Sequence, residues 1–291
     1  MSLDGRLAGA PISWGVCEVP GWGYQMTPDR VLGEMREVGL VATEFGPDGF
    51  LPDAPQDKAG LLSGYGLRAV GGFVPVVLHD PARDVLLGMD AILAGFTTAG
   101  ANTLVLAADT GLTGYDERIE LDESQWKTLL TNLDLIADAA REHAITATLH
   151  PHVGTIIEKE PEVARVLESS RIPLCLDTGH LLIGGTDPAA LAREVPERIA
   201  HTHLKDVNAD LARSVQSGQM SYTAAVKAGI YRPLGAGDVD IAGIVSSLEG
   251  AGYGGWYVME QDTVLGAEPP EHGGPVEDVR ASLAFVAGFA G

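Results

Sequence analysis

The sequence has very little cysteine, with only Cys17 and Cys175 in 291 residues. The two lie far apart in an otherwise cysteine-free chain, so no disulfide framework is expected, and a reducing cytoplasm is the expected location. Long apolar runs are missing as well, since no stretch approaches the ~20 apolar residues of a membrane span. The first residues lack the basic region and apolar segment of an export signal. We therefore expect a soluble cytoplasmic protein with no membrane partner.

Basic residues are scarce relative to acidic ones. The chain has 19 Lys and Arg against 40 Asp and Glu, which gives a formal net charge of −21. Such a field repels nucleic acid and anionic membranes, which select basic surfaces. A P-loop, a glycine fingerprint after a strand and a basic cluster are also missing, which argues against a phosphate site. The expected partner is an uncharged small molecule, and nucleic acid is not expected.

Apolar, strand-like runs alternate with helical segments along the whole chain. A length of 291 residues with 45% hydrophobic residues suits one α/β barrel of roughly 250 residues. Two domains would also fit this length, but no linker argues for them. Eight alternations favour a (β/α)₈ TIM barrel over an open doubly wound sheet, so we expect a single domain over residues 1–291. The predicted strands are residues 9–14, 40–45, 67–78, 103–107, 145–149, 172–176, 199–204 and 256–259, and the longest predicted helix is residues 122–143.

The alternation breaks once, between the seventh and eighth predicted strands, at residues 208–233. A long insertion in a compact domain often covers an active site, because loops at the carboxyl face of a barrel lie over it. A surface excursion or a contact in a homo-oligomer is the alternative. We expect this insertion to cover the mouth of a pocket or to form a subunit interface beside it.

Four side chains that can bind metal each follow an apolar run: His150, Asp177, His203 and Glu260. The carboxyl ends of barrel strands converge on one face, so the four are expected to meet there. Imidazole nitrogen and carboxylate oxygen together suit one divalent ion, Mn²⁺, Co²⁺, Zn²⁺ or Mg²⁺. Taken singly, each position has a plain structural explanation; Asp177, for example, could simply cap a turn. Four such residues on successive strands predict a metal site.

Three polar residues near these strand ends are candidates for catalysis. Lys205 lies two residues beyond His203, on the same side of the strand, and could bind or protonate a substrate oxygen, although lysine is usually exposed. His180 could serve as acid, base or hydroxyl donor, or it could pack against the next helix. Glu158 could orient a ligand or take a proton, or it could be a helix-start acid favoured by the dipole.

Candidates for substrate binding lie on the early strands. Glu44 interrupts an apolar strand near its carboxyl end, and a buried carboxylate is costly unless it has a partner, so a role in the site is favoured over an exposed turn. Trp14 could stack on a sugar ring, or it could belong to the barrel core. His79 begins the loop after the third predicted strand and is a weaker candidate.

Several segments resemble the xylose-isomerase-like superfamily of sugar isomerases and epimerases, and within it the inosose dehydratases. The similarity runs from about residue 11 to residue 285. It is carried by LHPHVGTIIE (149–158), LDTGH (176–180), HTHLKDV (201–207), SYTAAVKAGIYRPLG (221–235), PLGAGDVD (233–240) and AGYGGWYVMEQD (251–262), with further support from ISWG (12–15) and TEFGPDGFLP (43–52).

The resemblance implies a (β/α)₈ barrel with one divalent metal, usually held by Glu, Asp, His and Glu. Asp177, His203 and Glu260 match three of these positions, whereas His150 stands where the first glutamate is expected. His152 is the alternative ligand from this strand and otherwise a candidate for substrate binding. Epimerases of the superfamily use two facing glutamates, so the loss of one favours the dehydratase branch, which tolerates histidine here.

The expected function is therefore that of a metal-dependent lyase that removes water from 2-keto-myo-inositol or a related cyclic polyol ketone. Such an elimination needs a base, stabilisation of the enolate and an acid for the departing hydroxyl. Two alternatives stay open: a metal-dependent isomerase or epimerase of an unphosphorylated ketose, and a sugar-binding relative without turnover. Fold alone does not decide among them.

Overall fold

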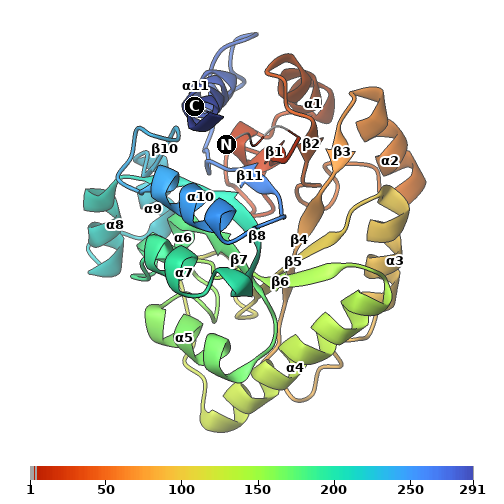
Figure 1. Ribbon diagram of the computed structural model, residues 1–291, viewed down its shortest axis with the longest axis vertical. Helices are drawn as coiled ribbons and strands as arrows, with labels where there is room; N and C mark the ends of the chain where they lie inside the picture. The colour runs from red at the N-terminus through yellow and green to blue at the C-terminus, as the bar shows by residue number, and fades with distance from the viewer. Residues whose placement is uncertain (1–2, 4, 291) are drawn as a thin grey trace.

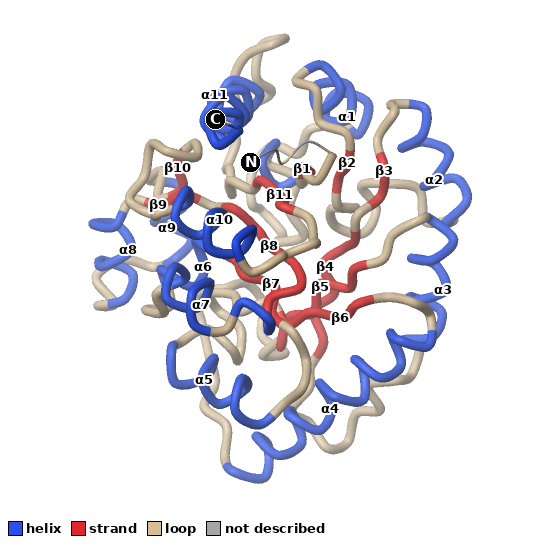
Figure 2. The backbone as a smooth tube through the Cα atoms, in the orientation of Figure 1, coloured by secondary structure: helices blue, strands red, loops and turns tan. Residues whose placement is uncertain are grey.

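The computed structural model describes residues 3 and 5–290, with a central ring of parallel strands surrounded by helices (Figure 1). Figure 2 shows the strands gathered in the interior and the helices at the periphery. The sheet has the order β3-β2-β1-β11-β8-β7-β6-β5-β4, and every pairing in it is parallel. Its strands are β1 (Leu7–Gly9), β2 (Ala42–Thr43), β3 (Arg68–Ala69), β4 (Gly71–Val76), β5 (Thr103–Ala108), β6 (Thr146–Leu149), β7 (Leu174–Asp177), β8 (Ile199–Leu204) and β11 (Tyr257–Met259).

The sheet closes into a barrel through the segment that holds β3 and β4. Only Val70 separates these strands; β3 pairs with β2, and β4 pairs with β5. The Val70 amide donates to the Thr43 carbonyl, and the Val70 carbonyl accepts from Thr103. A Cβ on Gly71 would lie 2.3 Å from the Thr103 oxygen, so only glycine permits this approach. β3 and β4 are thus two halves of the third of eight barrel strands, which confirms the predicted TIM barrel.

The strands and the outer helices share one extensive apolar core. All six residues of β5 are buried, as expected for a parallel strand covered on both faces. The longest helix, α4 (Glu123–Glu142), matches the predicted helix and buries one apolar stripe that includes Leu129, Leu133 and Ile136. The other outer helices are α1 (Pro28–Glu37), α2 (Pro55–Gly64), α3 (Met89–Ala99), α5 (Glu160–Ser169), α6 (Thr178–Ile183), α7 (Pro188–Glu194), α10 (Ile241–Gly250) and α11 (Pro275–Ala287).

The first predicted strand, residues 9–14, is wrong. The observed strand β1 ends at Gly9, and Pro11–Trp14 forms a 3₁₀ helix that ends at Gly15, whose φ is +78°. Pro11 has no N–H for a sheet ladder and suits the first turn of a helix. The apolar character of this segment reflects burial of the helix, because Trp14 has no exposed surface.

The insertion folds as a small unit beside the barrel. It contains α8 (Ala209–Gln216), α9 (Tyr222–Lys227) and β10 (Tyr231–Arg232), and β10 pairs antiparallel with β9 (Asp206–Val207). The loop that follows wraps around Asp206, whose carboxylate accepts from the backbone of Val207, Gly235, Gly237 and Val239. One buried carboxylate thus anchors the segment that leads to the last barrel strand.

No helix in the described part of the chain is long and apolar enough to cross a membrane. Cys17 and Cys175 are both free cysteines; Cys175 is buried.

Candidate active site

The four predicted metal ligands meet at the carboxyl end of the barrel. Asp177 Oδ2 lies 3.1 Å from His150 Nε2 and 3.6 Å from His203 Nδ1. His203 Nδ1 is in turn 3.1 Å from Glu260 Oε2. Donor atoms that share an ion at 2.0–2.2 Å must lie about this far apart. All four side chains are buried, so the cluster could hold a metal ion.

Asp177 combines both of the roles that the sequence allows. Its Oδ1 accepts from the backbone amides of Gly179 and His180 and caps α6. Its Oδ2 is turned toward His150 and His203. The cap fixes the orientation of the carboxylate, so turn formation and metal binding do not compete for the same oxygen.

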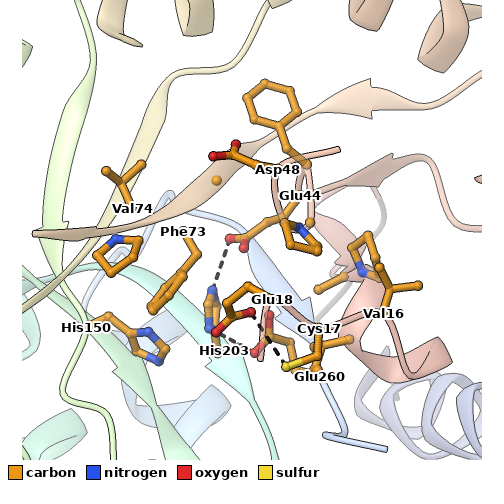
Figure 3. Close-up of a pocket in the computed structure, with 18 of the residues that line it drawn as sticks. Val16, Cys17, Glu18, Glu44, Asp48, Phe73, Val74, His150, His203 and Glu260 are labelled. Atoms are coloured by element: carbon orange, nitrogen blue, oxygen red, sulfur yellow. Dashed lines mark hydrogen bonds and ion pairs between the residues drawn. The ribbon is translucent and has the colours of Figure 1, made fainter. Parts of the chain in front are cut away.

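His203 is oriented by a carboxylate behind it. Glu44 Oε1 lies 3.0 Å from His203 Nε2 (Figure 3). The same oxygen lies 2.8 Å from His201 Nε2, and a carboxylate only accepts, so both rings carry hydrogen at Nε2. His203 Nδ1 is buried without a hydrogen-bond partner although Glu260 is close. A lone pair beside carboxylate oxygens is unfavourable unless a proton or a cation lies between them. This orphaned nitrogen therefore fits a bound cation.

The electrostatics of the cluster agree with this geometry. Burial opposes a charged imidazole, but Cys175, Glu260 and Glu44 outweigh it and hold the pKa of His203 well above its ordinary value. Burial also opposes a charged Glu44, yet His203 and His201 lower the pKa of this carboxyl. Burial dominates at His150 and lowers its pKa, so that ring is neutral and has a free lone pair.

Lys205, the residue directly after β8, enters the same cluster. Its Nζ lies 2.6 Å from Asp262 Oδ1, 3.1 Å from Glu260 Oε2 and 3.5 Å from Asp177 Oδ2. Burial opposes a charged amine, but these three carboxylates outweigh it and raise the pKa of Lys205 well above its ordinary value. Only 2% of the residue is exposed, so it is not the solvated strand end that lysine usually forms.

A cavity of about 720 Å³ opens onto this cluster and lies within the size range of small-molecule sites. Its floor includes His150, His203, Lys205, Glu260 and Asp262. Above the floor, Figure 3 shows Glu44 beside His203, with Phe73 and Val74 on one wall and Glu18 and Cys17 on another. Tyr115 and Trp22 complete the wall near Glu18, and the Tyr115 hydroxyl bonds to the Glu18 carboxylate.

Two of the predicted substrate-binding residues line this cavity, Glu44 and His152. His152 Nδ1 donates to the Val153 carbonyl at 2.7 Å, which leaves Nε2 with the lone pair. Burial lowers the pKa of His152 well below its ordinary value, so the ring is neutral. His180 does not line the cavity; it stacks behind His152 with ring centroids 3.7 Å apart and contacts Lys205.

Three other candidates lie outside the cavity lining, which corrects their expected roles. Trp14 is a core residue whose indole donates to Glu34. His79 is buried beyond the lining, and its Nδ1 has no hydrogen-bond partner. Glu158 accepts from the Gly154 amide and pairs with Arg118, so it organises the loop after β6. These three residues share apolar flanking sequence or a position near a strand end with the residues that do line the cavity. Neither feature of the sequence therefore separates the two groups.

The insertion also departs from expectation, because none of its described residues lines the cavity. Its two tyrosines, Tyr222 and Tyr231, lie behind the floor instead, and the Tyr222 hydroxyl donates to Asp262 Oδ2 at 2.7 Å. The insertion therefore does not line the cavity as a lid would, whereas a subunit interface beside the pocket mouth stays a prediction.

Sequence reasoning missed His201 and Asp262, although a signal for both exists. Each lies two residues from a predicted ligand, His203 or Glu260, and alternate residues of a strand share one face. The contribution of Tyr222 has no comparable signal, because it depends on how the insertion folds back.

Comparison with known proteins gives a consistent picture. Residues 87–287 match the family of xylose isomerase-like TIM barrels. The chain is 32% identical over 270 residues to an inosose dehydratase of Geobacillus kaustophilus (strain HTA426), covering 88% of this chain and 87% of that protein. It is also 32% identical over 297 residues to the rhizopine catabolism protein MocC of Rhizobium meliloti, covering 98% and 90%.

Solved structures with far lower sequence identity share the fold. An L-ribulose 3-epimerase superposes with a TM-score of 0.69 at 15% identity, covering 98% of this chain and 94% of that chain. The IolI protein, solved with a zinc atom bound, superposes with a TM-score of 0.68 at 14% identity, covering 98% and 97%.

Proposed function

Since the chain belongs to the xylose isomerase-like TIM-barrel family, we propose that it is a metal-dependent lyase that removes water from 2-keto-myo-inositol or a related cyclic polyol ketone. The observation that supports this assignment most directly is the floor of the cavity. There a buried ammonium, Lys205 Nζ, and an orphaned imidazole nitrogen, His203 Nδ1, each lie 3.1 Å from the buried carboxylate oxygen Glu260 Oε2. An elimination of water needs these groups together.

The proposed metal ligands are His150, Asp177, His203 and Glu260, which offer two nitrogens and carboxylate oxygens. This set accommodates Mn²⁺, Co²⁺, Zn²⁺ or Mg²⁺ and does not choose among them. A protein of the same fold was solved with a zinc atom bound, which supports a divalent ion as the cofactor. A divalent ion held there would act as a Lewis acid on the substrate ketone and acidify the neighbouring C–H.

We assign the two proton transfers to Glu260 and Lys205. Glu260 takes the proton from the carbon beside the ketone, and the electron pair moves toward the carbonyl to give an enolate. As the enolate collapses, the C–O bond to the β-hydroxyl breaks, and the Lys205 ammonium delivers a proton so that water departs. The product is an unsaturated ketone. Glu260 and Lys205 are 3.1 Å apart, so the captured proton can return to the amine and restore both groups.

An epimerase that works with two carboxylates is the second candidate, and His150 argues against it. An epimerase needs proton handling on both faces of one carbon, whereas His150 replaces the second carboxylate expected at β6. Glu44 lies across the cavity, and its Oε1 already accepts from the N–H groups of both His201 and His203, so this oxygen is engaged in orienting the two rings.

Mass spectrometry of reactions with a panel of inososes and free ketoses tests the proposal. Protein loaded with each divalent ion in turn should convert an inosose into a product lighter by one water, with a new enone absorbance. Conversion of ketoses into isomers of unchanged mass, with inososes untouched, would establish the epimerase instead. Metal binding without turnover of either class would favour the sugar-binding relative.

A further inference from the structure

The insertion contains two buried tyrosines that face the interior of the protein but do not line the cavity. Tyr222 begins α9 and Tyr231 begins β10, and their hydroxyls are 3.0 Å apart. Buried tyrosine hydroxyls normally serve a hydrogen-bond partner. Here the partner is Asp262, which holds the proposed acid, Lys205.

The contacts form a closed ring of five side chains. Lys205 Nζ lies 2.6 Å from Asp262 Oδ1, and Asp262 Oδ2 lies 2.7 Å from the Tyr222 hydroxyl. From Tyr222 the ring continues through the Tyr231 hydroxyl at 3.0 Å to His180 Nδ1 at 3.5 Å. His180 Nε2 closes it at 3.0 Å from Lys205 Nζ. All five side chains are buried.

The charges of two members fix most of the directions in the ring. The Lys205 ammonium only donates, so His180 Nε2 accepts from it, and the Asp262 carboxylate only accepts, so Tyr222 donates to Asp262 and Tyr231 donates to Tyr222. His180 Nδ1 lies 3.5 Å from the Tyr231 hydroxyl and 3.4 Å from the Val153 amide, which donates to it, so this link has no fixed direction. The two tyrosines thus hold Asp262, and Asp262 holds the ammonium from one side.

We propose that Tyr222, and through it Tyr231, are positioning residues that aim the Lys205 ammonium at the departing hydroxyl. This inference rests on the proposed function. Two of the three ammonium hydrogens are committed, one to Asp262 and one to His180, and the third is left for Glu260 or the substrate. The insertion thereby contributes to catalysis from behind the floor. Neither tyrosine touches the substrate.

Phenylalanine at position 222 tests this idea, and position 257 supplies a matched control. Tyr222→Phe removes one hydroxyl and leaves Asp262 Oδ2 without its donor. Tyr257→Phe removes a buried hydroxyl of the same kind, bonded at 2.8 Å to Glu249, whose other oxygen pairs with Arg6. The control lies at the opposite end of the barrel, so both variants lose a tyrosine-carboxylate bond, but only Tyr222 is bonded to a residue that lines the cavity, Asp262.

Kinetics on two substrates separate positioning from a general structural effect. On the inosose that the unmodified protein dehydrates, Tyr222→Phe should lower kcat about 10- to 100-fold with KM changed less than about twofold, and Tyr231→Phe should lower it less. On an analogue with fluorine in place of the departing hydroxyl, the kcat of both variants should be close to that of the unmodified protein, because fluoride leaves without full protonation. Tyr257→Phe should match the unmodified protein on both substrates.

Three results would overturn the inference. If Tyr222→Phe lowers kcat equally on the hydroxyl and fluorine substrates, the loss is a structural defect. If Tyr222→Phe leaves kcat unchanged on both, the ring is dispensable. If Tyr222→Phe does not fold, Tyr231→Phe decides by the same comparison. Failure of the unmodified protein to dehydrate any inosose would remove the proposed function and this inference with it, whereas dehydration with unaffected variants would remove the inference alone.

Discussion

The two ends of this barrel both hold charged side chains, half-buried at the amino end and buried at the carboxyl end, but they arrange them differently. At the amino end, Glu249 Oε2 pairs with Arg6 and Oε1 accepts from the Tyr257 hydroxyl, so each oxygen has one donor. At the carboxyl end, Glu44 Oε1 serves two imidazoles, and Glu260 Oε2 lies 3.1 Å from both His203 Nδ1 and Lys205 Nζ.

Buried polar atoms without a hydrogen-bond partner are also distributed unequally between the two ends. Buried ring nitrogens of His150, His201 and His203 lack a hydrogen-bond partner, and all three lie in the cluster at the carboxyl end. Paired charges with complete hydrogen bonding stabilise a fold, whereas shared and orphaned groups cost free energy. The difference indicates that the amino end serves stability and the carboxyl end serves chemistry, as in other TIM barrels.

The largest effect is expected from changes to the metal cluster. Glu260→Gln and His203→Ala should each lower turnover by roughly 10²- to 10⁴-fold, because they remove the proposed base or a metal ligand. The free energy of unfolding, measured by denaturant titration of the metal-free proteins, should change far less. Equal activity in either variant with metal retained would show that these residues lack their proposed roles.

The next largest effect is expected at Lys205. Lys205→Met should lower turnover about 10²-fold because it removes the proposed acid. Metal affinity should not fall, since one competing cation disappears from beside Asp177 and Glu260. Metal titration alongside steady-state kinetics separates the two quantities. Loss of metal binding in parallel with turnover would mean that Lys205 acts only by organising the ligands.

Metal affinity at the carboxyl end should depend on pH. The pKa of His203 in the metal-free protein is raised well above its ordinary value, so the ring is protonated at neutral pH, and an incoming ion must displace that proton. Affinity should therefore fall as pH decreases below this pKa, by up to about tenfold per pH unit for one proton, and level off above it. Calorimetry in buffers of different ionisation enthalpy measures the proton released. A pH-independent affinity near neutrality would contradict the raised pKa.

The smallest effect on activity is expected at the amino end. Glu249→Gln weakens the bond to Arg6 and should lower the free energy of unfolding by about 1–2 kcal/mol while turnover per folded molecule stays unchanged. Burial disfavours a charged Glu249, but Arg6 and Tyr257 outweigh it and lower its pKa. Its stabilisation is therefore complete at neutral pH and is lost as pH falls through that lowered pKa. A lower turnover per folded molecule in this variant would contradict the inference that the amino end serves stability and the carboxyl end serves chemistry.

The amino-acid sequence alone determined the barrel and the four clustered residues. Repeated strand-helix alternation specifies a (β/α)₈ fold because parallel strands need covering helices, and this topology brings strand ends to one face. His150, Asp177, His203 and Glu260 could be found for that reason. Each sits at or just beyond a strand end, where position along the chain dictates position in space.

Tertiary structure alone decided which other polar residues join the site. Trp14, His79 and Glu158 occupy plausible places in the sequence, yet their side chains face the core or a loop. The link from Tyr222 to Asp262 spans 40 positions of the chain and depends on how the insertion folds. Local sequence pattern encodes periodicity and strand ends, whereas the direction of a side chain in a loop or insertion follows from packing against distant residues.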